Sequence, residues 1–415
     1  MTLWNPVYRV KVNGTTATSA TLAGLTITSG RTDIYSQPIA GYCNLTLLET
    51  NESEVTYDVN DSVTIEVKDS TNAYVTLFGG FITDVSIQVA TSGSTALSQR
   101  INIIAVGALA RLARAIYTGN LSSDQDGDQI YAILTTLLYN QWNEVSSSLI
   151  WNDYDPTITW ANAENSGLGD IDRPGDYDLD SQNNLNDTIY NIVSKLATSG
   201  LGYLYEDSQG QIGYADATHR SDYWAANGFV ELDGNHAFGP GLQISKRAGD
   251  VRNDVTISYT TSGNSTHKEE DADSIAIYGR LATTIATTLK NQADATEQAL
   301  FYLALRKDPT YTMRQISFPL GSTEIDDNDR NALLEVFMGL PVKITNLPTN
   351  MVGGQFEGFV EGWTWRAGYN TLQLDLTISP FAYSIQTYQW QDVNAAETWN
   401  TLSASLIWED ATIVA

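Results

Sequence analysis

Apolar and polar residues alternate over several short stretches in the first 110 residues. The alternation covers residues 7–12, 22–28, 43–48, 63–67, 74–87 and 99–106. These stretches are rich in Thr, Val and Ile, and Gly, Asn and Asp separate them. A period of two residues with such separators is typical of the short strands of a sandwich or barrel. The pattern predicts a first small β domain over residues 1–114.

The pattern changes after Gly107 and becomes partly helical. Residues 107–117 predict a short helix, and residues 122–142 predict an amphipathic helix with an acidic start. A polar, Asp-rich stretch over residues 146–182 predicts a loop. A further helix over residues 183–200 leads into a hairpin whose turn is residues 207–210. We therefore expect an α+β middle domain over residues 115–235.

Alternation returns at about residue 240 and continues to residue 380. One helical stretch interrupts it at about residues 280–307, before Pro309. The pattern predicts a second β domain over residues 236–385. The remaining residues, 386–415, form a segment marked by Trp390, Trp399 and Trp408. The predicted class is mainly β, with two small barrel domains flanking a helix-hairpin insertion.

Two distant segments share the same layout, which predicts an internal duplication. Residues 61–67, 77–89 and 99–108 correspond in order to residues 340–346, 354–367 and 370–380. A Gly-Phe-aliphatic element occurs in both segments, at Gly80-Phe81-Ile82 and at Gly358-Phe359-Val360. Chance likeness between β-rich strands is the competing explanation. A duplicated domain would let three chains form a ring of six similar units, because cyclic closure is the common solution for such surfaces.

Composition and charge exclude several classes of function. The net charge is -27, from 49 acidic and 22 basic residues, with no cluster of Lys or Arg. We therefore exclude tight binding to nucleic acid, which requires such clusters. One cysteine and three dispersed histidines give little material for disulfides, zinc sites or Ser-His-Asp triads. No signal peptide or membrane-spanning stretch is evident, so we expect no stable membrane insertion.

Two acidic stretches and the Trp content suggest calcium binding and sugar chemistry as possible functions. Asp124, Asp126 and Asp128 suggest calcium, but an EF-hand would need Gly at residue 129 and Glu at residue 135, which are Gln and Thr. The Asp-rich loop at residues 170–180 remains a weaker calcium candidate. Carboxylate pairs and exposed aromatic side chains leave sugar hydrolysis or binding open as minor alternatives. We predict no catalytic residue, no metal and no cofactor.

Six motifs, in order over about residues 5–380, resemble one family. They are TSGRTDIYSQPIAGYCNLTL, IVSKLATSGLGYLYEDSQGQIGY, RNDVTISYTTSGN, DSIAIYGRLATT, MGLPVKITN and FVEGWTWRAGYNTLQLDLTISP. The chain resembles the tail hub or minor tail proteins of tailed bacteriophages, which are similar to the central baseplate hub of contractile-tailed phages. Hubs with a fused lysozyme or peptidase domain exist, but the chain has no length left for one.

The resemblance implies a non-enzymatic structural protein of the virion tail tip or baseplate. It implies a homotrimeric ring that adapts the six-fold tail tube to a three-fold tip, with DNA only in transit through an opening. The implied partners are further copies, a distal tail or tail-tube protein, and tip, fibre or spike proteins. An acidic wall would keep DNA from sticking to the opening. The alternative is a carbohydrate-binding adhesin or receptor-binding surface protein.

The loop at residues 29–41 and the C-terminal segment supply the candidate interface residues. Arg31 and Asp33 lie between Gly30 and Gly41, in a loop that the following strand would hold outward. Cys43 alternates with Leu45 and Leu47, which predicts a core position. Because Trp is enriched at the centres of interfaces, we expect Trp390, Trp399 and Trp408 to anchor the C-terminal segment. Packing of these Trp side chains within the chain is the alternative.

Overall fold

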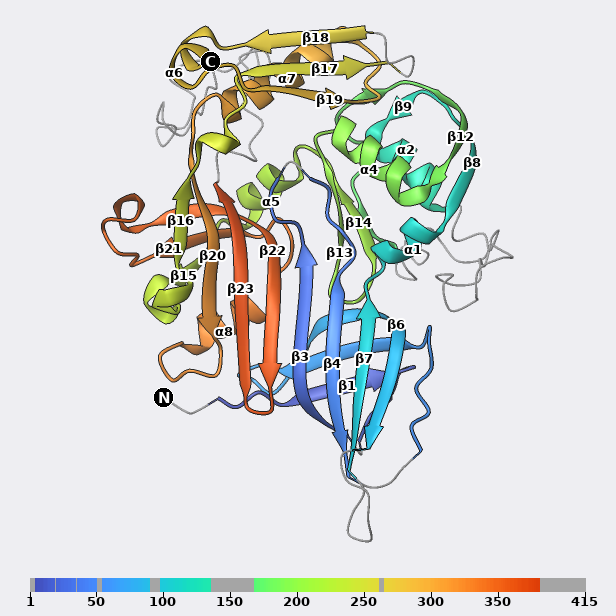
Figure 1. Cartoon of the computed structure of the whole chain (residues 1–415), viewed down its shortest axis with the longest axis vertical. Helices are drawn as coiled ribbons and strands as arrows, with labels where there is room; N and C mark the ends of the chain where they lie inside the picture. The colour runs from blue at the N-terminus through green and yellow to red at the C-terminus, as the bar shows by residue number, and fades with distance from the viewer. Residues whose placement is uncertain are drawn as a thin grey trace.

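One large sheet dominates the structure, a computed structural model that describes residues 4–18, 20–34, 36–50, 54–89, 98–135, 168–260 and 265–380. The sheet has 13 strands, in the order β16-β20-β23-β22-β3-β4-β7-β6-β5-β1-β2, with β15 and β21 joined to it beside β22 (Figure 1). Its strands are β1 (Tyr8–Val12), β2 (Thr15–Thr16), β3 (Ala20–Gly30), β4 (Tyr42–Glu49), β5 (Ser62–Lys68), β6 (Tyr74–Val89), β7 (Gln99–Val106), β15 (Val230–Asp233), β16 (Gln243–Lys246), β20 (Tyr311–Pro319), β21 (Pro341–Thr345), β22 (Phe356–Gly368) and β23 (Thr371–Pro380).

The strand alternation seen in the sequence places one face of this sheet in the core. Cys43, Leu45 and Leu47 of β4 are at most 1% exposed, and Ile101 and Ile103 of β7 are fully buried beside them. Burial also raises the pKa of the Cys43 thiol well above its ordinary value. The predicted core position of Cys43 is therefore confirmed, and the thiol behaves as a small hydrophobic group.

In the described residues, four smaller sheets and seven α-helices lie at the other end of the molecule or along the sheet (Figure 1). The strands are β8 (Ile116–Leu121), β9 (Asp124–Gln125), β10 (Leu168–Ile171), β11 (Asp178–Leu179), β12 (Gln182–Thr188), β13 (Tyr203–Glu206), β14 (Ile212–Ala215), β17 (Asp254–Tyr259), β18 (Ser265–Glu270) and β19 (Ala282–Ala286). The described α-helices are α1 (Leu109–Arg114), α2 (Asp126–Leu134), α4 (Ile189–Ser199), α5 (His219–Asn227), α6 (Ala272–Tyr278), α7 (Gln292–Arg306) and α8 (Asp327–Leu334). Short 3-10 turns occupy Gly234–His236, Gly239–Gly241, Ala248–Asp250 and Val352–Gly354.

All four predicted helices begin later than the sequence pattern indicated. The first two begin at Leu109 and Asp126, against expected starts at residues 107 and 122. The helix expected over residues 183–200 begins at Ile189, because residues before Thr188 pair with β8 as β12 and the Thr188 side chain caps the helix. The helix expected over about 280–307 begins at Gln292, where Asn291 caps it. The residues before it form β19, in keeping with the β-branched Thr283 and Thr284. The predicted hairpin is confirmed, since β13 and β14 pair around residues 207–210.

The buried apolar side chains form two cores. The first contains the strands of the large sheet from both ends of the chain, including Ile27 of β3 and Trp365 of β22. The second lies around α2, α4 and the hairpin, and it also contains Val255 of β17 and Ala299 of α7. The predicted domain boundaries at residues 114, 235 and 385 stay predictions.

The fold class is mainly β with an α+β insertion, as the sequence predicted. The two β units do not form separate barrels in the described residues; their strands join edge to edge in the single large sheet. The reason is that β22 is long enough to pair with β21 over its first half and with β3 over its second half. Within the described residues, no helix has both the length and the apolar character needed to cross a bilayer.

Candidate functional site

The two β units repeat the same strand ladder, which extends the duplication predicted from sequence. In each unit a central hairpin strand pairs with the strand before it and the strand after it, as β5-β6-β7 and as β21-β22-β23. Four cross-strand pairs of the first unit have counterparts in the second. In the first unit they are Val63↔Gly80, Phe81↔Val106, Val85↔Ile103 and Ile87↔Ile101. In the same order, the second unit has Val342↔Gly358, Phe359↔Ser379, Trp363↔Leu376 and Trp365↔Leu374.

Irregular features of the ladder repeat as well. Each central strand has a bulge, which skips Thr83 in β6 and Glu361 in β22. The backbone before β5 and β21 has a positive φ in both units, at Asn60 and at Gly339. Asn60 donates its N–H to the carbonyl of Ile82, and Gly339 donates in the same way to Val360. Shared bulges and shared turn geometry are stronger signs of duplication than alternation alone, because a chance match between strands would not reproduce them.

The units meet where the second half of β22 pairs with β3. Seven cross-strand pairs run from Gly362↔Gly30 to Gly368↔Gly24. Gly30 has a φ of +84°, and a Cβ at Gly30 would collide with the carbonyl of Glu361. Trp365 lies opposite Ile27 and is 1% exposed. This β22–β3 junction therefore combines a dense apolar face with a tight backbone approach that requires glycine.

A buried ion network holds the junction at the bulge. The Glu361 carboxylate accepts from Arg31 Nε at 2.7 Å, from Arg220 Nη1 at 2.7 Å and from Ser379 Oγ at 2.5 Å. Burial favours the neutral carboxyl, but the charges of Arg220 and Arg31 hold the pKa of Glu361 well below its ordinary value. Glu361 therefore links α5, the loop after β3 and β23 through one ionised group.

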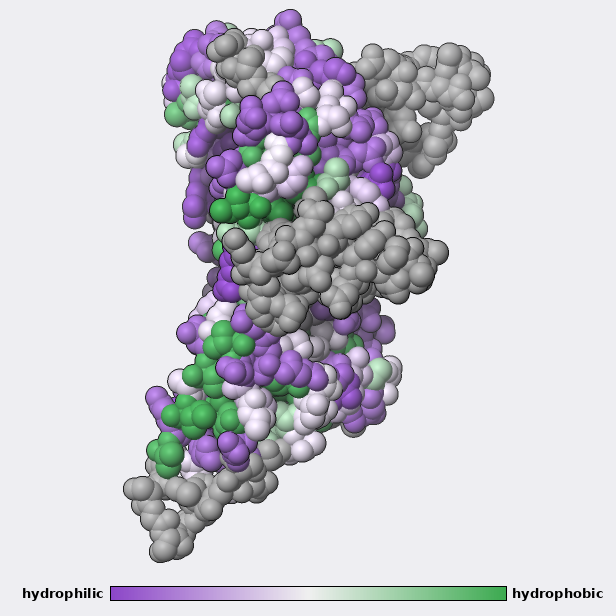
Figure 2. All heavy atoms as spheres, turned by 90° about the vertical axis from the view of Figure 1, so that its right-hand side faces the viewer, coloured by the Kyte–Doolittle hydropathy of each residue, from purple (hydrophilic) through white to green (hydrophobic). Residues whose placement is uncertain are grey.

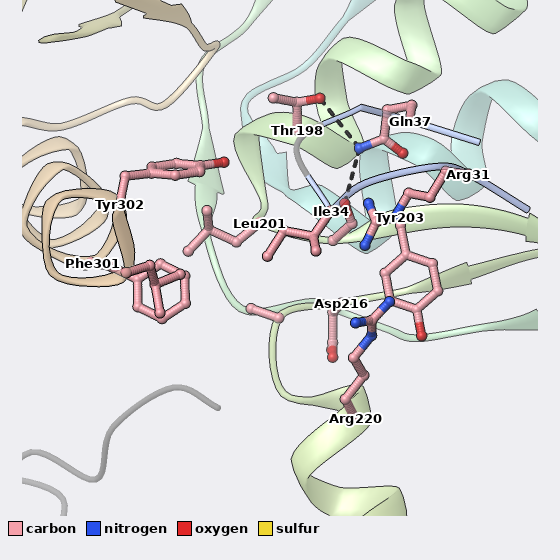
Figure 3. Close-up of a pocket in the computed structure, with 13 residues that line it drawn as sticks. Arg31, Ile34, Gln37, Thr198, Leu201, Tyr203, Asp216, Arg220, Phe301 and Tyr302 are labelled. Carbon is pink, nitrogen blue, oxygen red and sulfur yellow. Dashed lines mark hydrogen bonds between the residues drawn. The ribbon is translucent and has the colours of Figure 1, made fainter. Parts of the chain in front are cut away.

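The structure places Arg31 inside the molecule. Its side chain is 6% exposed, and its guanidinium carbon lies 5.2 Å from the centre of the Tyr203 ring. The guanidinium of Arg220 lies 4.5 Å from the same ring, and Figure 3 shows both groups beside it. A small cavity of about 60 Å³ adjoins them. The role of Arg31 at a partner interface stays a prediction, while its contacts within the chain position its loop.

The rest of this loop docks on the middle segment. Gln37 donates to Thr198 Oγ1 at 3.2 Å and to the Gly202 carbonyl at 3.0 Å, and it accepts from Leu204 N–H. Asp33 is half-buried, with Ser36 Oγ 3.3 Å from its carboxylate. A partner role for Asp33 stays a prediction. Trp390, Trp399 and Trp408 lie outside the described residues.

Glu206 fastens the hairpin to the large sheet. Its carboxylate accepts the N–H of Gly41, just before β4, and the N–H of Leu109 at 2.9 Å, at the start of α1. Gly41 and Gly107 leave room for it, since a Cβ at either position would collide with the carboxylate. Burial raises the pKa of Glu206 to about 7, although these N–H groups favour the ionised form.

The Asp-rich stretches serve structural roles in the described residues. Asp172 binds His219 Nδ1 at 2.7 Å, and Asp176 accepts Thr218 N–H at 3.0 Å, so both hold the start of α5. Asp126 is fully buried, where it accepts Tyr177 N–H and the Tyr214 hydroxyl. Burial raises the pKa of Asp126 to about 6. These contacts favour hydrogen bonding within the chain, over calcium binding, as the role of these aspartates.

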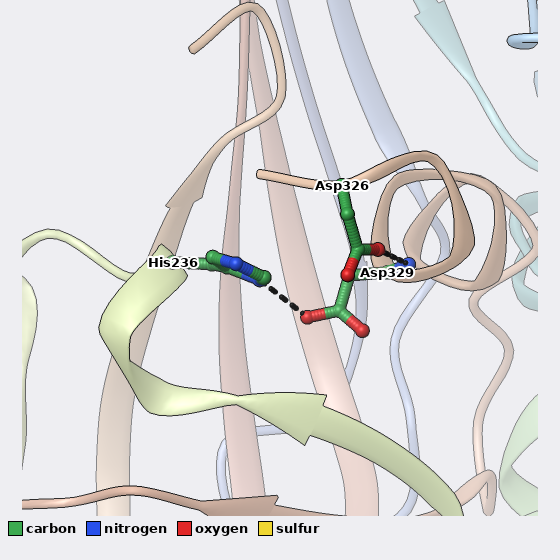
Figure 4. A group of neighbouring side chains, drawn as sticks. All are labelled: His236, Asp326 and Asp329. Carbon is green, nitrogen blue, oxygen red and sulfur yellow. Dashed lines mark hydrogen bonds and ion pairs between the residues drawn. The ribbon is translucent and has the colours of Figure 1, made fainter. Parts of the chain in front are cut away.

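One other side-chain group has the composition of a metal site. His236, Asp326 and Asp329 place one potential ligand atom each within 4.8 Å of one another (Figure 4). His236 Nδ1 lies 2.7 Å from Asp329 Oδ2, which also accepts Asp233 N–H at 3.0 Å. Asp326 caps α8 by accepting Asp329 N–H at 2.8 Å. Hydrogen bonds within the chain therefore occupy these two oxygens: Asp326 caps α8, and Asp329 joins the helix to His236 and Asp233.

Sequence reasoning did not find Glu361, Arg220 or Glu206. A signal for Glu361 exists, because it is an acidic residue inside the apolar run from Phe359 to Trp365. Such a residue in a central strand requires a buried cationic partner. Arg220 and Glu206 carry no comparable local signal, since their partners are distant in sequence.

Comparisons with known proteins agree with the fold. No family model matches the sequence, and no curated protein matches it. The tail protein of Neisseria meningitidis MC58 has a similar structure, with a TM-score of 0.58, 11% identity and coverage of 92% of this chain and 98% of that chain. The 43 kDa tail protein of prophage MuSo2 from Shewanella oneidensis gives a TM-score of 0.54 at 11% identity, over 91% of this chain and 99% of that one.

The fold of this chain is therefore shared with these two tail proteins, one of them from a prophage, over more than nine-tenths of the chain. The resemblance drawn from the sequence motifs is confirmed at the level of fold.

Proposed function

We propose that this protein is a non-enzymatic structural component of a bacteriophage tail, a hub that forms a homotrimeric ring at the distal end of the tail tube. The observation that carries the proposal is the repeated ladder: one chain holds two β units with the same register, already joined edge to edge. The fold shared with two tail proteins, one of them from a prophage, supports the tail assignment.

The repeat supplies the symmetry that a hub requires. A chain whose two like units join by unlike edges repeats one unit head to tail along the sheet, so three chains present six like units. Such a ring would match a six-fold tube on one side and a three-fold tip on the other. The tail-tube protein and the tip, fibre or spike proteins are its proposed neighbours at the virion tail tip or baseplate.

The solvent face of the sheet suits a wall that DNA passes without binding. On this face Thr28 Oγ1 lies 3.4 Å from Thr364 Oγ1, and Thr46 Oγ1 lies 3.1 Å from Asn102 Oδ1. The charged Arg366 is paired with Asp375 at 3.1 Å. Uncharged or neutralised groups offer phosphates no net attraction. We propose that this face lines the opening as a polar and charge-balanced wall, while the acidic wall expected from the net charge stays a prediction.

The adhesin alternative loses two of its aromatic platforms. Trp363 is 8% exposed and Trp365 is 1% exposed, because both pack in the β22–β3 junction. They are therefore unable to stack on a sugar. Packing in the β22–β3 junction of the proposed hub accounts for these two side chains better than sugar binding does.

Mass photometry and negative-stain microscopy of the full chain test the proposal. We expect a species of three chains and a six-lobed ring with a central hole. A monomer at every concentration, or particles without a hole, would overturn the ring. Retention of a fluorescent DNA duplex by the purified ring at physiological salt would contradict the non-binding wall.

A further inference from the structure

One half of β6 has an open edge in the described structure. Residues 84–89 pair with β7 on one side. On the other side the pairing with β5 extends only to Phe81, which lies opposite Ser62, the first residue of β5. Ile87 and Val89 are 48% and 58% exposed. Figure 2 looks onto this side of the molecule and shows hydrophobic side chains on its lower part, where β6 and β7 lie. An edge of this length with apolar side chains is a surface for pairing with another strand.

The second unit shows what covers this position. By the shared ladder, Ile87 corresponds to Trp365, and Ser86 corresponds to Thr364. In β22 these residues are paired with β3, where Trp365 faces Ile27 and Thr364 faces Thr28. The half-strand that is open in the first unit is therefore closed in the second unit by a strand of the neighbouring unit.

The strand equivalent to β3 is β16. Ile27 of β3 pairs with Cys43 of β4, and Ile244 of β16 pairs in the same way with Met313 of β20. Cys43 and Met313 in turn lie opposite equivalent residues of β7 and β23. Among the described strands β16 pairs only with β20, and six strands of the sheet separate it from β6 (Figure 1). One chain therefore has two complementary open edges that it is unable to join to each other.

We propose that β6 of one copy pairs antiparallel with β16 of a second copy, in the register of the β22–β3 junction. The register places Asp84 opposite Arg247, Ser86 opposite Ser245, Ile87 opposite Ile244 and Gln88 opposite Gln243. This inference rests on the proposed ring, for which it names the contact between copies.

The chemistry of the two edges fits this register. Asp84 and Arg247 are both exposed and carry opposite charges, and such cross-strand pairs are favourable. Ile87 would gain cover from the half-buried Ile244. The Oγ of Ser245 is buried and has no hydrogen-bond partner among the described residues. Its counterpart Thr28 meets Thr364 at 3.4 Å, and Ser86 stands at the position of Thr364.

A cysteine pair tests the register. In Ser86→Cys/Ser245→Cys, mild oxidation should link most chains into covalent multimers on a non-reducing gel, because directly opposed residues have the spacing of a disulfide. The native Cys43 is fully buried and does not compete. The matched control Thr28→Cys/Thr364→Cys should cross-link within one chain and leave the mass unchanged. Each single variant, and the off-register pair Ser86→Cys/Gln243→Cys, should cross-link much less.

Charge reversal gives an independent measurement. Asp84→Arg and Arg247→Asp should each raise the apparent dissociation constant of the assembly about tenfold, because like charges then face each other. The double variant Asp84→Arg/Arg247→Asp should restore the affinity of the original chain. Both residues are exposed, so the variants should fold as the original does.

The outcomes separate this inference from the proposed function. A trimeric ring without specific cross-linking and without charge rescue overturns the register and leaves the ring intact. Efficient cross-linking into open chains or rings of another number supports the register and overturns the trimer. A protein that stays monomeric and does not cross-link overturns both.

Discussion

The half-strand at residues 362–368 and the half-strand at residues 84–89 occupy the same place in two copies of one ladder, yet their surroundings differ. In β22 this half-strand is covered by β3, and its inward positions are the bulky Trp363 and Trp365. In β6 the same positions are the smaller Val85 and Ile87, and Ile87 is half exposed. The same strand ladder thus forms a permanent junction within the chain in one unit and an accessible edge in the other. Bulky, buried inward side chains mark the junction, and smaller, more exposed ones mark the edge.

The largest difference between the units should appear when the inward side chain is truncated. Trp365→Ala should lower the free energy of unfolding by about 3–5 kcal/mol, because it opens a cavity in a closed junction. Ile87→Ala should cost less than about 1 kcal/mol in the monomer, where the side chain is half exposed. Urea unfolding of both variants at low protein concentration measures the contrast. Equal losses would mean that the two half-strands are equally buried.

The bulge residues should also differ sharply. Glu361→Gln should cost about 3 kcal/mol, because Arg31 and Arg220 lose their buried anionic partner. The equivalent Thr83 only donates to the Ile104 carbonyl at 3.2 Å, so Thr83→Val should cost about 1 kcal/mol. The denaturation midpoint in urea at pH 7 reports both effects. A mild Glu361→Gln variant would show that the network does not hold the junction.

Stability should fall as the pH rises from 5 to 8. The pKa of Glu206 is about 7 in the folded chain against an ordinary value of 4.5, so the folded state binds the proton more tightly. Its contribution is full below about pH 4.5 and is lost through pH 7, by about 3 kcal/mol in total. Asp216, with a raised pKa of about 7, acts in the same direction.

Glu206→Gln isolates this effect. The variant should flatten the dependence of the unfolding free energy between pH 5 and pH 8, measured by urea titration at fixed ionic strength. Asp216→Asn, which alters a different group, should leave the Glu206 part of the slope in place. An unchanged slope in Glu206→Gln would exclude Glu206 as its source.

The smallest contrast concerns two glycines with positive φ. Gly30→Ala should cost about 2 kcal/mol or more, because strain at φ +84° is joined by a collision with the Glu361 carbonyl. Gly14→Ala, at φ +73° with open space around the new Cβ, should cost about 1 kcal/mol. Thermal unfolding of the two variants compares them directly. Similar losses would mean that the junction backbone can move apart.

Local patterns predicted the strands well, because burial on one face imposes a period of two that any strand must show. Cys43 and the repeated Gly-Phe-aliphatic element are examples. The joining of the units was not predictable in this way. The sequence of β22 has the alternation of one long strand whether β21 alone pairs with this edge or both β21 and β3 do. The loop of Arg31 illustrates the same limit. Its exposed appearance came from polar residues whose partners, Glu361 and Thr198, lie far along the chain.

The repeat also changes how strongly assembly depends on protein concentration. The β22–β3 junction closes within one molecule, so the effective concentration of its two strands is set by the chain and not by dilution. Under the proposed pairing, only the β6–β16 contacts depend on protein concentration. A ring of six units built from three chains then loses the translational freedom of two bodies, where a ring built from six separate subunits would lose that of five. Gene fusion of two units would thus favour a complete ring at low copy number, and dilution would release whole chains.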